Sequence, residues 1–294
     1  MSEKPPSRLA LVIHPTRELA GALATLREWA PPRAVDLVQL PGDGVPRPDV
    51  APQASLQLGD LVVAVGGDGT VLSALRAAAG PAAPVLGVAC GSLGALTAVS
   101  VDHLDEALDR VYAGDWVPRP LPAISVRAAN GGGVDWALND IVILRAGPGQ
   151  VLIDVAVEEE RYVRMAGDGL IVATPAGSSG YTMAAGGPLL AAGAPAFVCT
   201  PLAMHGGSAP PLVVRSDATV SLQVQPTHGG FQLEMDGHRR RLEGHCFRLT
   251  FEEERAKLVT FSPSDQGLRR LRERGLIADS PRVLARDRRT SARR

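Results

Sequence analysis

The first 113 residues alternate short apolar runs with segments in which apolar side chains recur every three or four positions. The apolar runs predict buried strands, and the three-to-four spacing predicts amphipathic helices. Strands that alternate with helices are typical of a parallel sheet covered by helices. The predicted strands are residues 9–13, 35–40, 61–65 and 85–89, and the predicted helices are residues 16–29, the segment after Thr70 and residues 101–112.

Helical spacing nearly disappears beyond the Trp116-Val117-Pro118 sequence, where short β-rich runs separated by turn residues take over. Many short strands with turn signals between them predict an antiparallel sandwich or a similar β domain. We therefore expect an α/β + β fold, with a Rossmann-like α/β domain and parallel sheet over residues 1–113 and a β-sandwich-type domain over residues 114–248. The predicted strands of the second part are residues 123–127, 136–144, 151–157, 162–163, 170–173, 212–214, 220–224 and 231–235.

Composition sets the context for this fold. With 294 residues, 45% of them hydrophobic, the chain has the apolar content of a globular protein with one large domain or two. Three widely spaced cysteines and the lack of an apolar signal core near Met1 favour a reducing, cytoplasmic setting. The uncharged residues 77–99 are as many as a membrane span needs, but prolines and glycines break them into short elements. We therefore expect no membrane partner.

The net charge of −1 conceals an asymmetry, because residues 269–294 contain ten arginines and only three acids. The tail is therefore about +7 and the rest of the chain about −8. Such a tail could bind nucleic acid, yet it has no aromatic residue on which a base could stack. We expect a solvated terminal helix and no nucleic-acid partner.

A glycine-rich turn directly follows the apolar residues 61–65 and precedes a helical segment. It consists of Gly66, Gly67, Asp68, Gly69 and Thr70. Helix starts offer unpaired N–H groups and glycines let a polyanion approach the backbone, so this turn is suited to phosphate binding. Its carboxylate could then act as a general base or as a Mg²⁺ ligand. Capping of the helix by the same carboxylate is the alternative, and the turn alone does not separate the two.

A second polar segment lies at residues 167–181, where an acid leads into an apolar strand and then into a loop rich in Pro, Gly and hydroxyl residues. Hydroxyl groups and exposed amides are good partners for ribose and phosphate oxygens, and Tyr181 could pack against a base. A β-turn with a core tyrosine would explain the segment equally well when it is taken alone. The chain has no G-x-x-x-x-G-K-[ST] sequence, so a P-loop is excluded.

Taken together, these segments resemble the NAD kinase family, over roughly residues 60 to 240 and in matching order. The matching sequences are GGDGT at residues 66–70, LND at 138–140, DGLIVATPAGSSGY at 168–181, AAGGP at 184–188 and DGH at 236–238. The resemblance implies phosphorylation of the adenosine-ribose 2′-hydroxyl of NAD by ATP, or in some members by polyphosphate, giving NADP. It also implies Mg²⁺ or another divalent cation that arrives with ATP rather than in a protein cage.

The family fold implies that residues 249–294, including the basic tail, return to the α/β domain, and that the chain forms a homodimer or homotetramer. Carried over by motif, Asp68 would be the proton acceptor, and Asn139 with Asp140 would bind the dinucleotide. His238 would lie near the substrate. The phosphate-side turn would be Gly66, Gly67, Gly69 and Thr70, and the nucleoside pockets would be lined by Ala166, Asp168, Ser179, Gly180, Tyr181, Thr182, Met183 and Ala184.

The chain also departs from the family pattern at several positions. Ala89 and Ala95 stand where members commonly have an Asn and an aromatic residue, Asp140 replaces a Glu, and Ala166 replaces an Arg or Lys. Ser179 and Gly180 replace a Thr and an Ala. Two alternatives to an NAD kinase therefore stay open: a related kinase acting on a lipid such as diacylglycerol or sphingosine, and a divergent NAD(H)-binding sensor with weak activity.

Overall fold

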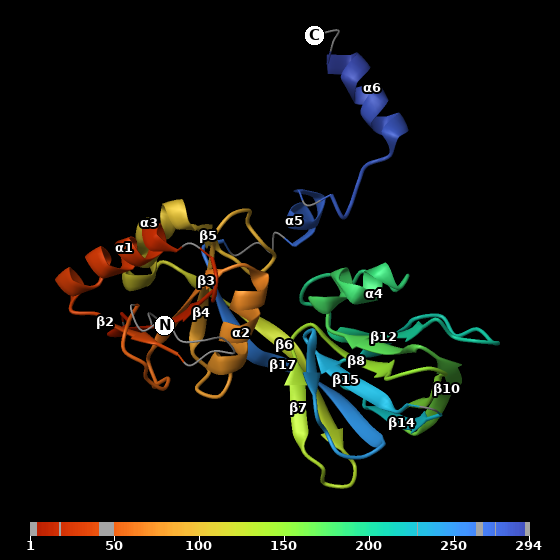
Figure 1. The fold of residues 1–294 in the computed structure, drawn as a ribbon. Helices are drawn as coiled ribbons and strands as arrows, with labels where there is room; N and C mark the ends of the chain where they lie inside the picture. Colours follow the sequence, from red (N-terminus) through yellow and green to blue (C-terminus); the bar gives the residue numbers. More distant parts are fainter. Residues whose placement is uncertain are drawn as a thin grey trace.

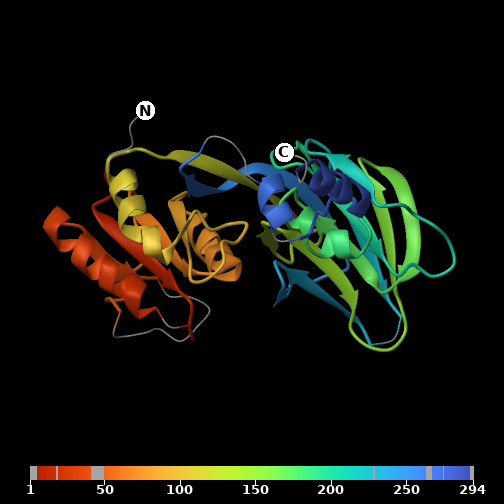
Figure 2. The same ribbon diagram turned by 90° about the horizontal axis from the view of Figure 1, so that it is seen from above.

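The computed structural model describes residues 5–17, 19–40, 50–227, 229–262, 267–273 and 275–291, and these form two sheets with helices over part of the larger one (Figures 1 and 2). The larger sheet has eleven strands, with β10-β9-β14-β17-β4-β3-β1-β2 as its main order and β5, β6 and β7 attached to it. The smaller sheet has six strands in the order β13-β12-β11-β8-β15-β16. The predicted combination of α/β and β architecture is confirmed at this level.

The N-terminal part of the larger sheet is parallel, as the alternation of strands and helices predicts. Strand β1 lies between β2 and β3, and β3 pairs in turn with β4. The strands are β1 (Arg8–Ile13), β2 (Asp36–Gln39), β3 (Leu61–Gly66), β4 (Pro84–Ala89) and the short β5 (Val99–Ser100); the helices are α1 (Ala20–Trp29), α2 (Asp68–Ala78) and α3 (Leu104–Tyr112), with 3₁₀ turns η1 (Pro31–Arg33) and η2 (Val101–His103).

Both faces of this parallel sheet are buried. Successive residues of a strand point to opposite faces, so Val63 and Val65 pack with α1 and α3 on one side. Val62 and Ala64 pack with α2 on the other. This arrangement explains why β3 is a continuous apolar run rather than an alternating one.

The C-terminal part is built from two antiparallel layers that enclose a shared core. Residues of both layers, such as Ile153 and Val220 in one and Ile143 and Phe197 in the other, belong to a single buried cluster. The strands in the larger sheet are β6 (Val117–Ala128), β7 (Val134–Ala137), β9 (Val151–Val157), β10 (Glu160–Gly167), β14 (Val220–Pro226) and β17 (Cys246–Thr260). Those of the smaller sheet are β8 (Asp140–Arg145), β11 (Gly169–Ala173), β12 (Ala196–Leu202), β13 (Leu212–Arg215), β15 (Phe231–Met235) and β16 (His238–Arg240).

Strand β17 joins the two parts, and the sequence pattern did not predict it. It pairs antiparallel with β6 along most of its length and parallel with β4 through Lys257 and Leu258. The charged residues 252–255 interrupt its apolar alternation, and the register with β6 shifts between Glu252 and Ala256. A bulge lets this charged segment leave the ladder while the strand continues. Strands β12 and β16 were also missed.

Several predicted boundaries were wrong for identifiable reasons. Helix α1 begins at Ala20 rather than at Thr16, and η2 precedes α3 where one helix was expected. The predicted strand 136–144 is two strands, because the chain turns at Leu138-Asn139 to pass from one sheet to the other. Strand β6 extends back to Val117 despite three prolines. The first half of β6 pairs with β17 on one side and is an edge on the other, where a missing N–H group breaks no ladder hydrogen bond.

The C-terminal segment contains two short helices, α5 (Gly267–Glu273) and α6 (Pro281–Ser291). Leu271 of α5 is buried, whereas residues 281–286 of α6 are exposed, and α6 extends away from the two sheets (Figure 1). Residues 263–266, 274 and 292–294 of the tail lie outside the described residues. The domain boundaries at residues 113 and 248 stay a prediction. Within the described ranges, no helix has the length and apolar content needed to cross a membrane.

Candidate active site

The Gly66–Thr70 turn lies at the point of the parallel sheet where ligands usually bind. The chain runs from β1 outward to β2 and then returns to β3 on the other side, so the strand order reverses between β1 and β3. Clefts form at the carboxyl ends of strands at such a reversal. Asp68 is the first residue of α2 and follows the carboxyl end of β3, which places its carboxylate at this edge.

Asp68 is not the N-cap residue of its helix. The N-cap of α2 is Gly67, which has no side chain. The two carboxylate oxygens of Asp68 accept hydrogen bonds from the backbone N–H groups of Ala95 and Leu96, each at 2.9 Å. The loop after β4 therefore fixes the direction of this carboxylate.

Glycines in the turn and in the facing loop make this approach possible. A Cβ atom at Gly94 would lie 2.0 Å from Oδ1 of Asp68, and one at Gly66 would lie 2.3 Å from Oγ1 of Thr70. A side chain at either position would therefore have to displace the Asp68 carboxylate or the Thr70 side chain. Gly67 and Gly69 have no such neighbour, so their small size leaves the outer side of the turn open.

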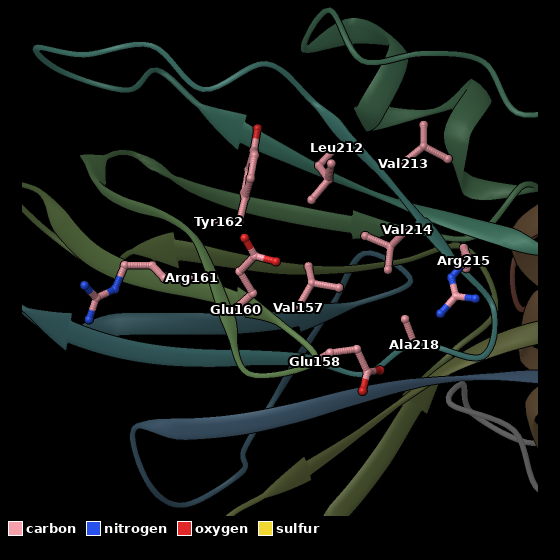
Figure 3. A pocket seen from close by; sticks show the side chains of 10 residues that line it. All are labelled: Val157, Glu158, Glu160, Arg161, Tyr162, Leu212, Val213, Val214, Arg215 and Ala218. Atoms are coloured by element: carbon pink, nitrogen blue, oxygen red, sulfur yellow. The ribbon is translucent and has the colours of Figure 1, made fainter.

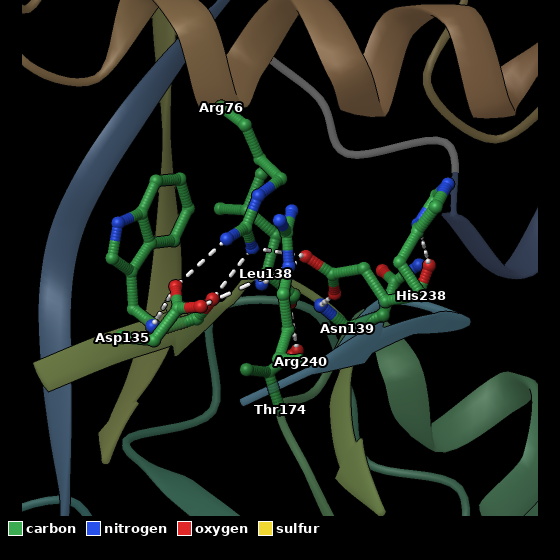
Figure 4. A network of polar contacts seen from close by, with 9 residues as sticks. Arg76, Asp135, Leu138, Asn139, Thr174, His238 and Arg240 are labelled. Carbon is green, nitrogen blue, oxygen red and sulfur yellow. Dashed lines mark hydrogen bonds and ion pairs between the residues drawn. The ribbon is translucent and has the colours of Figure 1, made fainter. Parts of the chain in front are cut away.

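The break between β7 and β8 presents the Asn139-Asp140 pair, and its backbone is fully hydrogen-bonded (Figure 4). The buried carboxylate of Asp236 accepts the N–H groups of Leu138 at 3.1 Å and Asn139 at 2.7 Å. Thr174 satisfies both carbonyls, since its hydroxyl donates to that of Leu138 and its N–H to that of Asn139. The break is thus a defined conformation, which rigidly positions the Asn139 side chain.

Asp140 occupies an unfavourable environment for a charged group. Burial raises the pKa of its carboxyl to about 6, and the negative charges of Asp236 and Glu234 act in the same direction. Between the ordinary value of 3.8 and about 6, the folded state therefore holds a proton that the unfolded state has lost. The free energy of unfolding must fall as the pH rises through this window and stay lowered above it.

Replacing Asp140 by Asn is therefore expected to raise the free energy of unfolding near pH 7.5 by roughly 1–3 kcal/mol, because one unit of pKa shift corresponds to about 1.4 kcal/mol. The gain should shrink toward zero near pH 4, where the native carboxyl is neutral. Urea unfolding at both pH values measures the effect, with Glu106→Gln on the exposed face of α3 as the control. A gain of equal size at both pH values would contradict the assignment.

The loop after β11 packs against the same break and then opens to solvent. A Cβ atom at Gly177 would lie 2.0 Å from the carbonyl oxygen of Asn139, so the two segments are in direct contact. The Ser179 hydroxyl donates to the carbonyl of Ala176, and Thr182 is fully buried. Tyr181, by contrast, is 44% exposed and available for stacking. Gly180 and Ala184 are exposed beside it, and Met183 is half-buried.

Two predicted site residues lie elsewhere. Because β11 runs antiparallel to β8, Ala173 pairs with Asp140 and Gly169 with Leu144. Asp168 therefore lies at the other end of β11, about 15 Å of strand away, where it forms an ion pair with Arg145 at 2.6 Å. Ala166 accepts a backbone hydrogen bond from His205 near that same end. The nucleotide-binding role of Asp168 and Ala166 stays a prediction.

His238 lies in the turn region that also carries Asp236. It is exposed, and its Nδ1 lies 3.0 Å from the carbonyl oxygen of Asp236. Through contacts with Asp236, the structure brings His238 close to Asn139 and Asp140. Figure 4 shows His238 beside Asn139. Sequence reasoning missed Arg76, in the last turn of α2, which donates to the carboxylate of Asp236 at 3.1 Å. A single arginine in a helix carries no signal that would have identified it.

One of two surface cavities lies beside the glycine-rich turn. A cavity of about 460 Å³ lies between β10 and β13 and is lined by residues such as Tyr162, Val213 and Arg215 (Figure 3). None of the predicted site residues lines it. A second cavity of about 340 Å³ is lined in part by residues 89–91, at the carboxyl end of β4. The N–H of Cys90 in this cavity donates to the carbonyl of Gly66, so the second cavity adjoins the glycine-rich turn.

The donor groups near the glycine-rich turn decide which kind of metal site it could form. Among the residues that the structure describes, no group of three or more His, Cys, Asp or Glu side chains could hold one. Asp68 is the one acid of its turn, so it offers a single carboxylate. Mg²⁺ is commonly held by one or two carboxylates together with substrate phosphates and water. The residues present fit a cation that arrives with a phosphate ligand.

Family models cover much of the chain. The ATP-NAD kinase N-terminal domain matches residues 48–116, and the ATP-NAD kinase C-terminal domain matches residues 138–254. The NAD kinase of Heliobacterium modesticaldum is 38% identical over 182 residues, covering 60% of this chain and 64% of the relative. The NAD kinase of Bdellovibrio bacteriovorus is 38% identical over 184 residues, covering 61% of this chain and 60% of the relative. These two matches thus span less than two thirds of the relatives' own length.

A longer match and two solved structures extend the similarity. The NAD kinase of Chlorobaculum tepidum is 30% identical over 246 residues, covering 80% of this chain and 84% of the relative. Yeast NADH kinase complexed with NADH has a TM-score of 0.74 at 19% identity, covering 95% of this chain and 90% of that one. The NAD kinase from Archaeoglobus fulgidus in complex with ATP has a TM-score of 0.71 at 24% identity, covering 90% and 97%. The chain therefore belongs to the NAD kinase family.

Proposed function

We propose that this protein transfers the terminal phosphate of ATP to the adenosine-ribose 2′-hydroxyl of NAD or NADH, giving NADP or NADPH. One observation carries the proposal. The carboxylate of Asp68 lies in a glycine-rich turn at the carboxyl edge of a parallel sheet, and the helix that begins there reaches the Asn139-Asp140 pair through Arg76 and Asp236. A phosphate-binding turn and a nucleoside-binding pair thus belong to one connected structure.

Asp68 has the role of proton acceptor in this proposal. A ribose hydroxyl is a weak nucleophile, and a carboxylate within hydrogen-bond reach helps by taking its proton as the bond to phosphorus forms. The N–H groups of Ala95 and Leu96 hold this carboxylate in one orientation. A fixed acceptor loses little freedom when the substrate binds, which favours reaction over mere binding.

The nucleoside would be recognised near the end of α2 that carries Arg76. In the described part of the chain, no hydrogen bond to the side-chain amide of Asn139 is found, so it can offer a donor and an acceptor to an adenine edge. Asp140 can accept from ribose hydroxyls, and Tyr181 can stack on a base. Ser179, Gly180, Thr182, Met183, Ala184, His238, Asp168 and Ala166 remain proposed contacts by family membership.

The donor phosphates would approach the turn formed by Gly66, Gly67, Gly69 and Thr70, where the backbone is accessible. Mg²⁺ bound to these phosphates would offset their charge, with Asp68 as the one carboxylate of the turn near it. Polyphosphate as an alternative donor, assembly into a homodimer or homotetramer, and a cytoplasmic location are parts of this proposal that rest on family membership.

A lipid acceptor has no support in these observations, since the relatives and structures compared above are all named NAD or NADH kinases. A sensor that binds NAD(H) with weak activity is the other alternative, and the departures at Ala89, Ala95 and Asp140 motivate it. An NADP-formation assay tests both. NAD and NADH are each combined with ATP and with polyphosphate, and the product is identified by mass. Tight NAD(H) binding without NADP or NADPH would overturn the proposal and favour the sensor.

A further inference from the structure

We infer that Arg76 and Asp236 are positioning residues that hold the nucleoside-binding Asn139-Asp140 pair in place from helix α2, an inference that rests on the proposed function. Neither residue needs to touch a substrate for this role. Asp236 fixes the backbone of the pair, and Arg76 connects Asp236 to the helix that begins with Asp68.

Asp236 is built into the strand break rather than placed at its surface. Its side chain is 0% exposed, and its carboxylate receives two backbone N–H groups, from Leu138 and Asn139. Its own N–H donates to the carbonyl of Asp140 at 3.0 Å. Asp236 therefore contacts the backbone of three consecutive residues. Its φ of 52° lies in the left-handed region, an uncommon conformation that these contacts stabilise.

A fully buried carboxylate needs a positive partner, and Arg76 supplies it. Nη1 of Arg76 lies 3.1 Å from Oδ2 of Asp236 and also donates to the carbonyl of Trp136 at 2.5 Å. Nη2 donates to Oδ1 of Asp135 at 2.8 Å. One guanidinium thus reaches acceptors on β7 and on the β15–β16 turn, because its donors are spread over a wide planar fork.

The indole of Trp136 limits the movement of this guanidinium. The Arg76 group lies 4.5 Å from the ring centroid, and the Arg255 group lies 4.8 Å from the same ring. These are cation–π distances. Arg255 belongs to β17, the strand that joins the two parts of the fold. Arg76 is therefore held on the side of α2 that faces the strand break, where it contacts Asp236 (Figure 4).

The two substrates should depend on this network differently. Asn139-Asp140 is proposed to recognise the nucleoside of NAD, while the donor phosphates are proposed to bind the turn at the other end of α2, about 12 Å of helix from Arg76. Arg76→Lys keeps a positive charge beside Asp236 but loses the fork that also reaches Asp135 and the Trp136 carbonyl. We expect the KM for NAD to rise at least about tenfold and the KM for ATP to change less than about twofold.

Arg110→Lys is a matched control, because Arg110 also pairs with an acid, Asp115 at 2.7 Å, and also lies over an aromatic ring, Phe261 at 4.4 Å. It lies on α3 and has no contact with the strand break, so both KM values should stay at those of the unchanged protein. Equal rises in both KM values for Arg76→Lys, or no rise in either, would overturn the inference. Asp236→Asn, which is expected to reproduce the same split, serves if the lysine variant folds poorly.

Amide hydrogen exchange separates this inference from the proposed function. In Arg76→Lys, the N–H groups of Leu138 and Asn139 should exchange at least about tenfold faster, because their acceptor Asp236 is no longer held. The Ala95 and Leu96 amides, which bond to Asp68, should exchange as before. If the unchanged protein forms no NADP, the proposed function fails, and the exchange pattern still decides whether Arg76 holds the break. The positioning role would be overturned if exchange became faster at all amides alike. It would also be overturned if exchange at Leu138 and Asn139 did not become faster.

Discussion

Replacing Asp68 by Asn is expected to lower kcat for NADP formation by about 10²–10⁴, the usual contribution of a general base. The amide has nearly the shape of the carboxylate but cannot take the proton of the ribose hydroxyl. Asn can still accept one of the N–H groups of Ala95 and Leu96, so we expect a loss of stability of only about 1–2 kcal/mol. Steady-state kinetics measures kcat, thermal unfolding measures the stability, and titration calorimetry measures the affinity for NAD.

Asp105→Asn is the matched control for this change, because Asp105 is likewise an acid in the first turn of a helix of the α/β part. It is exposed on α3, which packs on the opposite face of the parallel sheet from α2, and its replacement should leave kcat unchanged. Gly94→Ala adds a second test, since its Cβ would meet the Asp68 carboxylate at 2.0 Å and displace it without removing it. A fully active Asp68→Asn variant with normal NAD affinity would refute the base assignment.

The parts of the fold that could be predicted from sequence are those in which burial alone decides the pattern. Strands β9 and β15 match the predicted residues 151–157 and 231–235, since each alternates or runs apolar between clear turn signals. Strand β17 could not be predicted, because its charged residues 252–255 lie in a bulge that only the pairing with β6 explains. The pattern of neighbouring residues carries no information about the partner strand, and pairing with that partner allows β17 to continue past its charged residues.

The residues of the candidate site likewise fall into those that the sequence reveals and those that it does not. Asp68, Asn139 and Asp140 were found because each belongs to a short motif whose residues are adjacent in the sequence. The Arg76–Asp236 ion pair joins residues 160 positions apart, so neither of them indicates the other. The sequence also gives no sign of the backbone amides that hold Asp68, because any residue at positions 95 and 96 except proline supplies an N–H group. The loss of the family's aromatic residue at Ala95 therefore leaves this contact intact.

The placement of Asp168 shows how a motif can be right in order and still mislead about distance. DGLIVATPAGSSGY reads as one segment, but β11 occupies its first half and separates Asp168 from the loop that packs on Asn139. A strand of five residues spans about 16 Å. Sequence proximity therefore predicts spatial proximity within the loop at residues 174–184, but not between that loop and Asp168.

Replacing Gly177 by Ala is expected to have the largest effect on stability among single methyl additions in the candidate site. The new Cβ would lie 2.0 Å from the carbonyl oxygen of Asn139 and 2.4 Å from its carbonyl carbon, so backbone must move on one side or the other. Overpacking of this kind costs about 1–3 kcal/mol or more, which should lower Tm by roughly 5 °C or more. Because the displaced group is Asn139 itself, the KM for NAD should rise at least about tenfold.

Gly21→Ala is the control outside this loop. Gly21 is an exposed residue of helix α1, and a Cβ atom there would have no atom within 4 Å. We expect its Tm not to fall, because alanine favours a helix over glycine, and its KM for NAD to change less than about threefold. If Gly177→Ala behaved like Gly21→Ala in both measurements, the close contact between this loop and Asn139 would not exist in solution. A fall in Tm with an unchanged KM for NAD would instead separate the packing of the loop from nucleoside binding, and would contradict the role proposed for Asn139.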